Sequence, residues 1–219
     1  MTFLLILFTI QILAIFLNLL KFISRKKMVD VLRFSYGFFL IFSGFVKILD
    51  PLGFSYKLQE YFEVFGLEWI IPLSLLLSIL ICSFEILIGF CLIYGVQVKY
   101  VLYANLVLMI GFTFLTFYSA YFNAVTDCGC FGDFMKLDPW FSFQKDIVLL
   151  GVSIVLFINK SVIEQIFNTQ LTYKVLCASF LVVLFVPVYA LSNLPFIDFR
   201  AYNIGASIID GRKLPNNAI

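Results

Sequence analysis

Long apolar runs separated by short charged segments dominate the chain. A helix that crosses the hydrocarbon layer of a bilayer needs about 20 mostly apolar residues, and each of these runs has few or no charged positions. A backbone surrounded by lipid must form its hydrogen bonds within its own segment, because the hydrocarbon layer holds no water, and an α-helix does so. The pattern therefore predicts an all-α integral membrane protein. We interpret the runs as six transmembrane helices, over residues 2–20, 30–48, 70–96, 100–123, 143–160 and 175–192.

The segment over 143–160 is the weakest of the six. Only residues 147–159 are free of charge, and that length falls short of a full crossing. This helix must therefore gain a turn within 141–146 or continue past Lys160 if it is to span the membrane.

Positive charge is concentrated after the first apolar run, at Lys21, Arg25, Lys26 and Lys27. Loops rich in Lys and Arg remain in the cytoplasm, so this loop is predicted to be cytoplasmic. A cleaved signal peptide has its positive charge before the apolar run, which favours a retained first helix here. Six crossings then place both termini on the non-cytoplasmic side, including the extended tail predicted over 193–219.

Two loops carry apolar residues at helical spacing, which is typical of short helices that lie flat on a membrane surface. We therefore predict short interfacial helices in both loops, with partner binding as the alternative. The apolar positions are Phe54, Leu58, Tyr61, Phe62 and Phe65 in one loop and Val162, Ile163, Ile166 and Phe167 in the other.

Composition supports the membrane class and excludes several functions. Hydrophobic residues make up 63% of the chain and charged residues 13%, whereas a soluble domain carries about 25% charged residues. The net charge is only +2, and the basic residues are too few and too dispersed to form the basic face that nucleic-acid binding requires. Because the chain contains no His, histidine-held haem, His-ligated zinc and Ser-His or Cys-His catalysis are excluded.

The sharpest motif is Cys128-Gly129-Cys130, in the loop after the fourth predicted helix. That loop lies on the predicted outer face, where disulfides persist. A disulfide between thiols one residue apart closes a small ring, which is a poor staple and is easily reduced when strained. We interpret Cys128 and Cys130 as a catalytic redox pair. A structural pair, or a zinc site completed by a partner chain, is the alternative.

The other cysteines, Cys82, Cys91 and Cys177, fall inside predicted helices. Cys82 and Cys91 lie on one helix about 13 Å apart along its axis, so they cannot bridge each other. Lone cysteines in apolar surroundings behave as small hydrophobic residues. No second redox pair is therefore predicted.

Glu85 is a carboxylate inside an apolar run, which by default marks a buried ion pair or a functional site. Its position about 22 Å along its helix places it in the cytoplasmic half, where Arg33 is the expected partner. Lys47, at the outer end of the second helix, is the less favoured partner. A structural pair with Arg33 or a protonated Glu85 is one interpretation, and a proton or quinone site is the other. Asp50-Pro51 predicts a helix end, because Pro51 blocks continuation.

Together these residues resemble the DoxX/MauE family of small bacterial membrane proteins, over roughly residues 29–159. The resemblance implies a four-helix membrane core, formed by the second to fifth predicted helices, in a multi-pass protein of the bacterial inner membrane. It also implies redox-associated function, as in the quinone-linked or thiol-stress membrane complexes of DoxX relatives, with a quinone as the candidate cofactor. The matching residues are Arg33, Ser43-Gly44, Lys47, Asp50-Pro51, Glu85, Gly89 and the Cys128–Phe131 loop with Gly132.

The preferred hypothesis is a membrane thiol–disulfide protein that assists disulfide formation or maturation of envelope proteins, with both termini periplasmic. Its expected partners are membrane lipid and a periplasmic or membrane protein, with no nucleic acid and no metal. If Cys128 and Cys130 are catalytic, the activity is that of a thiol–disulfide oxidoreductase. The alternative is a non-catalytic membrane subunit that scaffolds a larger inner-membrane complex.

Overall fold

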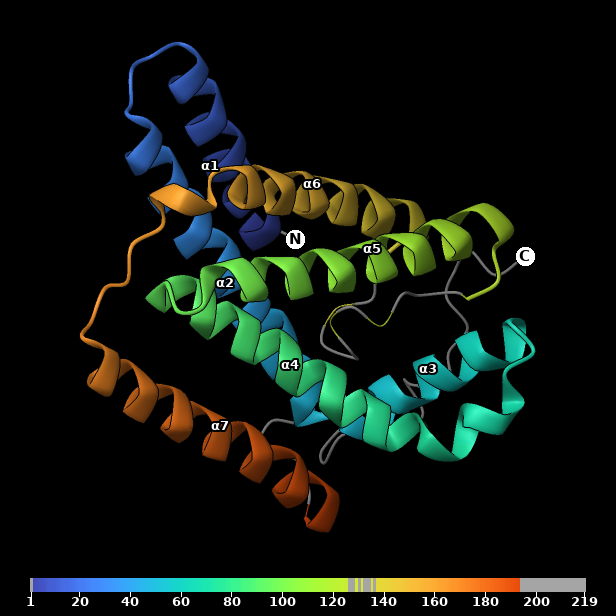
Figure 1. Cartoon of the computed structure of the whole chain (residues 1–219). Coiled ribbons are helices and arrows are strands. Elements are labelled where there is room, and N and C mark those ends of the chain that lie inside the picture. The colour runs from blue at the N-terminus through green and yellow to red at the C-terminus, as the bar shows by residue number, and fades with distance from the viewer. Residues whose placement is uncertain (1, 126–128, 130, 132–134, 136, 194–219) are drawn as a thin grey trace.

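A computed structural model describes residues 2–125, 129, 131, 135 and 137–193. The described residues form helices joined by short connections, with no strand among them (Figure 1). The helices are α1 (Thr2–Leu19), α2 (Arg25–Leu49), α3 (Pro51–Val64), α4 (Ser74–Tyr94), α5 (Val98–Phe122), α6 (Pro139–Ile158) and α7 (Thr169–Ser192), with short 3-10 turns η1 (Glu68–Leu73) and η3 (Lys160–Val162).

The all-α membrane prediction is confirmed. In the described part of the chain, five segments are long and apolar enough to cross a bilayer, and α1 adds a shorter apolar helix over Phe3–Leu19. The five segments are Arg25–Leu49, Glu68–Tyr94, Val98–Phe122, Pro139–Ile158 and Gln170–Ser192.

The doubtful fifth segment gains its length on the N-terminal side. Asp138 caps α6, and its carboxylate accepts hydrogen bonds from the backbone N–H groups of Trp140 (2.9 Å) and Phe141 (3.3 Å). Pro139 occupies the first turn, where its missing N–H leaves no intrahelical hydrogen bond unmade. The capped start extends the helix to 20 residues, which is long enough to cross.

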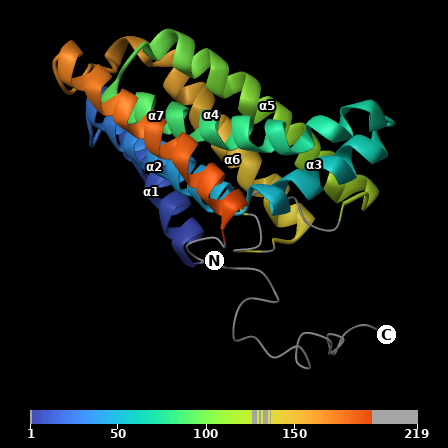
Figure 2. The same ribbon diagram turned by 90° about the horizontal axis from the view of Figure 1, so that it is seen from below.

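Helices α2 and α4 pack closely because small residues face each other along their contact. A Cβ added at Gly89 would lie 2.7 Å from the backbone oxygen of Gly37, and one added at Gly44 would lie 3.0 Å from the oxygen of Cys82. Small interfacial residues of this kind let helix backbones approach in a membrane. The remaining helices pack around this pair: α1 against α2, α7 against both α2 and α4, α5 against α4, and α6 against α2 and α5 (Figure 2).

The first loop predicted to lie on the membrane surface instead packs its apolar face against the helix bundle. It forms α3, as its helical spacing predicted, but Phe54, Leu58 and Tyr61 are buried. Phe54 and Leu58 share a hydrophobic cluster with Ile86 of α4. The apolar face of α3 therefore covers the bundle rather than lipid. The helix end predicted at Asp50-Pro51 is confirmed, because α2 ends at Leu49. Asp50 then caps α3, and its carboxylate accepts a hydrogen bond from the Gly53 N–H (3.0 Å).

The second predicted interfacial helix, over 162–167, is not formed. After the short turn η3 the chain is extended at Ile163. The Ile166 N–H donates to the backbone oxygen of Tyr94 (3.2 Å), so this segment is tied to the end of α4. Of its apolar side chains, Ile163 packs into the main hydrophobic cluster, whereas Ile166 and Phe167 remain exposed.

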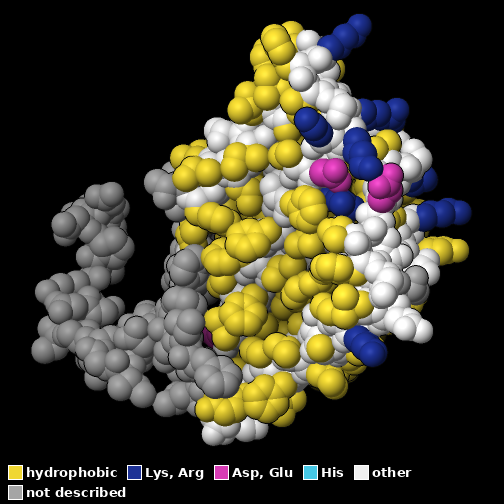
Figure 3. All heavy atoms as spheres, turned by 90° about the vertical axis from the view of Figure 1, so that its left-hand side faces the viewer, with side chains coloured by type: hydrophobic (Ala, Val, Ile, Leu, Met, Phe, Trp, Pro, Cys, Tyr) yellow, Lys and Arg dark blue, Asp and Glu magenta, His cyan; other side chains and the backbone are white. Residues whose placement is uncertain are grey.

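Basic residues gather at one end of the helix bundle. The α1–α2, α4–α5 and α6–α7 connections all lie at this end because successive helices alternate in direction, and exposed Lys21, Arg25, Lys27 and Lys99 lie on or beside them. The view in Figure 3 shows Lys and Arg side chains along one edge of a face that is otherwise largely hydrophobic.

Candidate functional site

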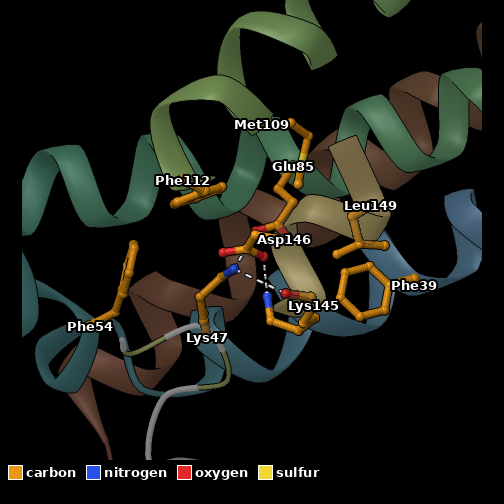
Figure 4. Close-up of a pocket in the computed structure, with 10 residues that line it drawn as sticks. Phe39, Lys47, Phe54, Glu85, Met109, Phe112, Lys145, Asp146 and Leu149 are labelled. Carbon is orange, nitrogen blue, oxygen red and sulfur yellow. Dashed lines mark hydrogen bonds and ion pairs between the residues drawn. The ribbon is translucent and has the colours of Figure 1, made fainter. Parts of the chain in front are cut away.

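Four ionisable side chains meet inside the helix bundle. Lys47 comes from α2, Glu85 from α4, and Lys145 and Asp146 from the first turns of α6 (Figure 4). Each is at most 4% exposed. Charges in a membrane interior are costly, and where they occur they pair with one another or mark a site. The sequence-predicted pocket residues Lys47 and Glu85 therefore belong to one cluster, which also contains Lys145 and Asp146.

The first ion pair joins α2 to α4. Lys47 Nζ lies 2.5 Å from Glu85 Oε2 and also donates a hydrogen bond to Ser43 Oγ (3.1 Å), one turn back on α2. The ammonium group lies 5.6 Å from the ring centroid of Phe54 and 5.3 Å from that of Phe112. Aromatic faces attract a cation, so these rings partly compensate the lost hydration of Lys47.

The second ion pair lies within α6. Lys145 Nζ contacts Asp146 Oδ1, and Thr116 of α5 donates a hydrogen bond to Asp146 Oδ2 (3.0 Å). The Lys145 ammonium lies 5.9 Å from the ring centroid of Phe39 and 5.8 Å from that of Phe131. Both carboxylate oxygens of Asp146 thus have partners, which a buried carboxylate requires.

The two pairs line a small cavity. Its volume is about 20 Å³, which is room for about one water molecule. The two ammonium groups and two carboxylates balance in formal charge, and Phe39, Met109, Phe112 and Leu149 close the remaining walls. A cavity of this size can hold water and relay a proton between side chains, but it does not hold a bulky cofactor.

The prediction that Glu85 pairs with Arg33 is wrong. The close contacts between α2 and α4 place Gly44 of α2 opposite Cys82 and Ile86 of α4, so Glu85 lies near the level of Gly44. Along α2, Lys47 is about one turn from that level and pairs with Glu85, whereas Arg33 is more than two turns away. The count along the sequence failed because the first part of α4 runs beside α3, past the end of α2.

Arg33 belongs instead to the basic end of the bundle. Its Nε lies 3.0 Å from Asp30 Oδ1, and its Nη1 donates to the backbone oxygen of Glu164 (2.8 Å). Lys26 donates to Glu164 Oε2 (2.7 Å), and this hydrogen bond, with the charge of Lys26, holds the pKa of the Glu164 carboxyl below its ordinary value. These contacts fasten the segment after α6 to the start of α2.

Asp50 also has a structural position. It joins α2 to α3 as a cap and does not line the cavity. Among the described residues no group of three or more potential ligands could hold a metal ion.

Cys128 and Cys130 lie outside the described residues, but Gly129 and Phe131 beside them are described. Gly129 has φ +63°, and a Cβ there would lie 2.9 Å from Lys57 Cγ of α3. Phe131 is 1% exposed, and its ring centroid lies 5.9 Å from that of Phe39. The residue that follows Cys130 thus packs against Phe39 of α2 and beside the Lys145 ammonium.

Lys145 and Asp146 were missed as site residues by sequence reasoning. In the sequence they lie at the margin of a short apolar run, within the stretch 141–146 that the fifth helix needed in order to reach full length. The helix-start signal Asp138-Pro139 could have revealed Lys145 and Asp146 as interior residues, because a helix that begins there contains both of them about two turns from its start.

The helical bundle and its buried ion pairs define a multi-pass membrane protein with a charged interior site. Residues 25–159, which cover α2 to α6 and more than half of the chain, match the family described as Methylamine utilisation protein MauE. The chain belongs to this DoxX-related membrane family, which confirms the MauE part of the resemblance. No curated protein and no solved structure matches the chain.

Proposed function

We propose that the protein is a thiol–disulfide redox protein of the bacterial inner membrane, in which Cys128 and Cys130 exchange electrons with an envelope protein. The observation that carries this proposal is the contact of both residues beside Cys130 with the surroundings of the charge cluster. Phe131 lies over Lys145, and Gly129 lies near Phe54, whose ring also faces Lys47.

The chemistry is thiol–disulfide exchange. A thiolate of the client protein attacks the loop disulfide, and one loop sulfur leaves as a thiolate. The second client thiolate then attacks the mixed disulfide, which forms the client disulfide and releases the second loop sulfur. Two electrons pass to the loop, and the two protons from the client thiols end on the loop thiols. Reoxidation of the loop needs a two-electron acceptor, and a quinone is the class that the family resemblance implies.

The family description indicates the process in which a client would be found. MauE is described as a methylamine utilisation protein, so the natural client would be an envelope protein of methylamine metabolism that requires disulfides. In this proposal the Cys128 loop faces the periplasm, and both termini lie on the same side.

Replacement of the loop cysteines tests the redox proposal. In cells with Cys128→Ser and Cys130→Ser, we expect at least one envelope protein to accumulate free thiols, measured by differential alkylation and mass spectrometry. Cys82→Ala is the matched control, because Cys82 is fully buried in α4 and plays no part in the exchange. Unchanged thiol status in every envelope protein of the double variant would refute the proposal.

A non-catalytic scaffold is the second candidate function. The observation that favours it is that the cavity is water-sized and its charges are already paired. One pair joins α2 to α4, and the pair within α6 is tied to α5 through Thr116, as in a site that only holds helices together. Copurification from native membranes in mild detergent discriminates the two. A stoichiometric complex that survives loss of both loop thiols, with envelope thiols unchanged, supports the scaffold.

A further inference from the structure

Two cysteines that are 86 positions apart in the sequence line one groove of the bundle. Cys91 lies on α4 and Cys177 on α7, and these helices run side by side in opposite directions (Figures 1 and 2). Both thiols line the same groove and are free. From the sequence alone, each of them was interpreted only as a small apolar residue.

The register of α4 against α7 places the two thiols at the same level. Cys82 and Ile86 share a hydrophobic cluster with Val183 and Val186, and Phe90 lines a neighbouring groove with Ser179. Because the two helices are antiparallel, residue numbers on α7 decrease along the contact as residue numbers on α4 increase. The sum of the two numbers at any one level therefore stays nearly constant. Extension of this register brings Cys91 and Cys177 to the same level of the two helices, and both line the groove beside the α4–α7 contact.

The groove is apolar and lies on the outside of the bundle. Its volume is about 440 Å³, within the range of small-molecule sites. Apart from the two thiols, the described residues that line it are Leu87, Leu176, Phe180 and Leu181. Cys91 is partly buried and Cys177 is exposed on helices that cross the membrane, so the groove opens toward lipid. A molecule that reaches these thiols must therefore be soluble in the membrane.

We propose that Cys91 and Cys177 form a second redox site, which reacts with an apolar two-electron oxidant that enters from the lipid. The two thiols lose two protons and two electrons, and a disulfide forms between α4 and α7. The oxidant takes up the same two electrons and two protons. The product fixes α7, which packs against the bundle along one side, to α4.

This site is independent of the Cys128 loop. Cys91 is three residues before the end of α4 and Cys177 is in the third turn of α7, both near the basic end of the bundle. The loop follows α5 at the opposite end. The second site therefore stands whether or not the loop pair exchanges electrons with a client.

Titration with a limiting amount of dipyridyl disulfide, an apolar disulfide, tests the proposal. The full-length protein in lipid nanodiscs carries Cys128→Ser and Cys130→Ser, so that Cys91 and Cys177 are the accessible thiols. A paired site displaces both halves of the reagent, and we expect about two thiopyridone molecules released per reagent molecule. After tryptic cleavage between α4 and α7, the two helices should remain linked until a reductant is added.

The matched control moves the second thiol by one position. In the same background, Cys177→Ser with Ala178→Cys places a thiol at the same level of α7, on the side that lines the neighbouring groove. This control should release about one thiopyridone per reagent and leave the helices unlinked. One thiopyridone per reagent from the Cys91–Cys177 protein would overturn the proposal, as would equal linkage in the control.

Discussion

At the scale of single residues, Lys47 and Glu85 stabilise each other, because each charge compensates the hydration that the other loses on burial. Both side chains are buried, and their mutual contact replaces hydration that the bundle excludes. Loss of one partner of a buried pair costs about 3–5 kcal/mol, because the other charge remains uncompensated, whereas loss of both is far less costly.

We therefore expect Lys47→Met alone and Glu85→Met alone to destabilise the protein by about 3–5 kcal/mol each, and the double replacement to destabilise it less than either. Thermal unfolding in detergent, followed by circular dichroism, measures the order. Lys27→Met is the control, because Lys27 is exposed near the start of α2, and it should leave the midpoint unchanged. Single replacements as stable as the native protein would show that the pair is not formed.

The sequence identified Lys47 and Glu85 as site residues but assigned Glu85 the wrong partner. Distance along one helix gives depth only if neighbouring helices start at the same level. Here α3 extends the bundle beside α4 at the end opposite the basic loops, so Lys47 lies deeper than its place near the end of α2 suggested. Contacts between helices, which the sequence does not contain, decided the pairing.

At the scale of elements, the close contact between α2 and α4 depends on glycines, which have no side chain to hold the two helices apart. A Cβ at Gly89 would lie 2.7 Å from the Gly37 backbone oxygen and 2.7 Å from Ile41 Cγ1. Backbone cannot move aside as a flexible side chain can, so the helices must separate. Because Glu85 is one turn from Gly89, separation also loosens the charge cluster.

Gly89→Ala should accordingly destabilise the protein by about 1–3 kcal/mol, measured as a lower midpoint of thermal unfolding in detergent. Gly111 on α5 is the matched control, since a Cβ there meets nothing within 4 Å. Gly111→Ala should be neutral or stabilising by up to about 1 kcal/mol, because alanine is the better helix former. Equal effects of the two substitutions would contradict close packing at Gly89.

Helices were predictable from the sequence to within a few residues, whereas their surroundings were not. The apolar spacing of Phe54, Leu58 and Tyr61 predicted α3 correctly, but an apolar face fits lipid and protein equally well. Cys91 and Cys177 show the same limit, because nothing in either helix alone indicates that the two lie at one level. Periodicity identifies the face that avoids water, and tertiary packing decides what covers it.

At the scale of the whole molecule, the unequal distribution of charge between the two ends predicts how the bundle is inserted. The α1–α2, α4–α5 and α6–α7 connections carry the basic residues of one end, while α3 and its acidic residues lie at the other. Loops rich in Lys and Arg stay in the cytoplasm, which places α3 on the periplasmic side.

Cysteine labelling in cells tests this orientation with two exposed positions, Lys27 beside the first loop and Glu63 on α3. The background carries Ser at 128, 130 and 177, so that the introduced thiol is the accessible one. A membrane-impermeant maleimide should label Glu63→Cys in intact cells and Lys27→Cys only after the inner membrane is permeabilised. The reverse pattern would place the charge cluster and the Cys128 loop nearer the cytoplasm. Thiol exchange with an envelope client would then be impossible, because the client and the loop would lie on opposite sides of the membrane.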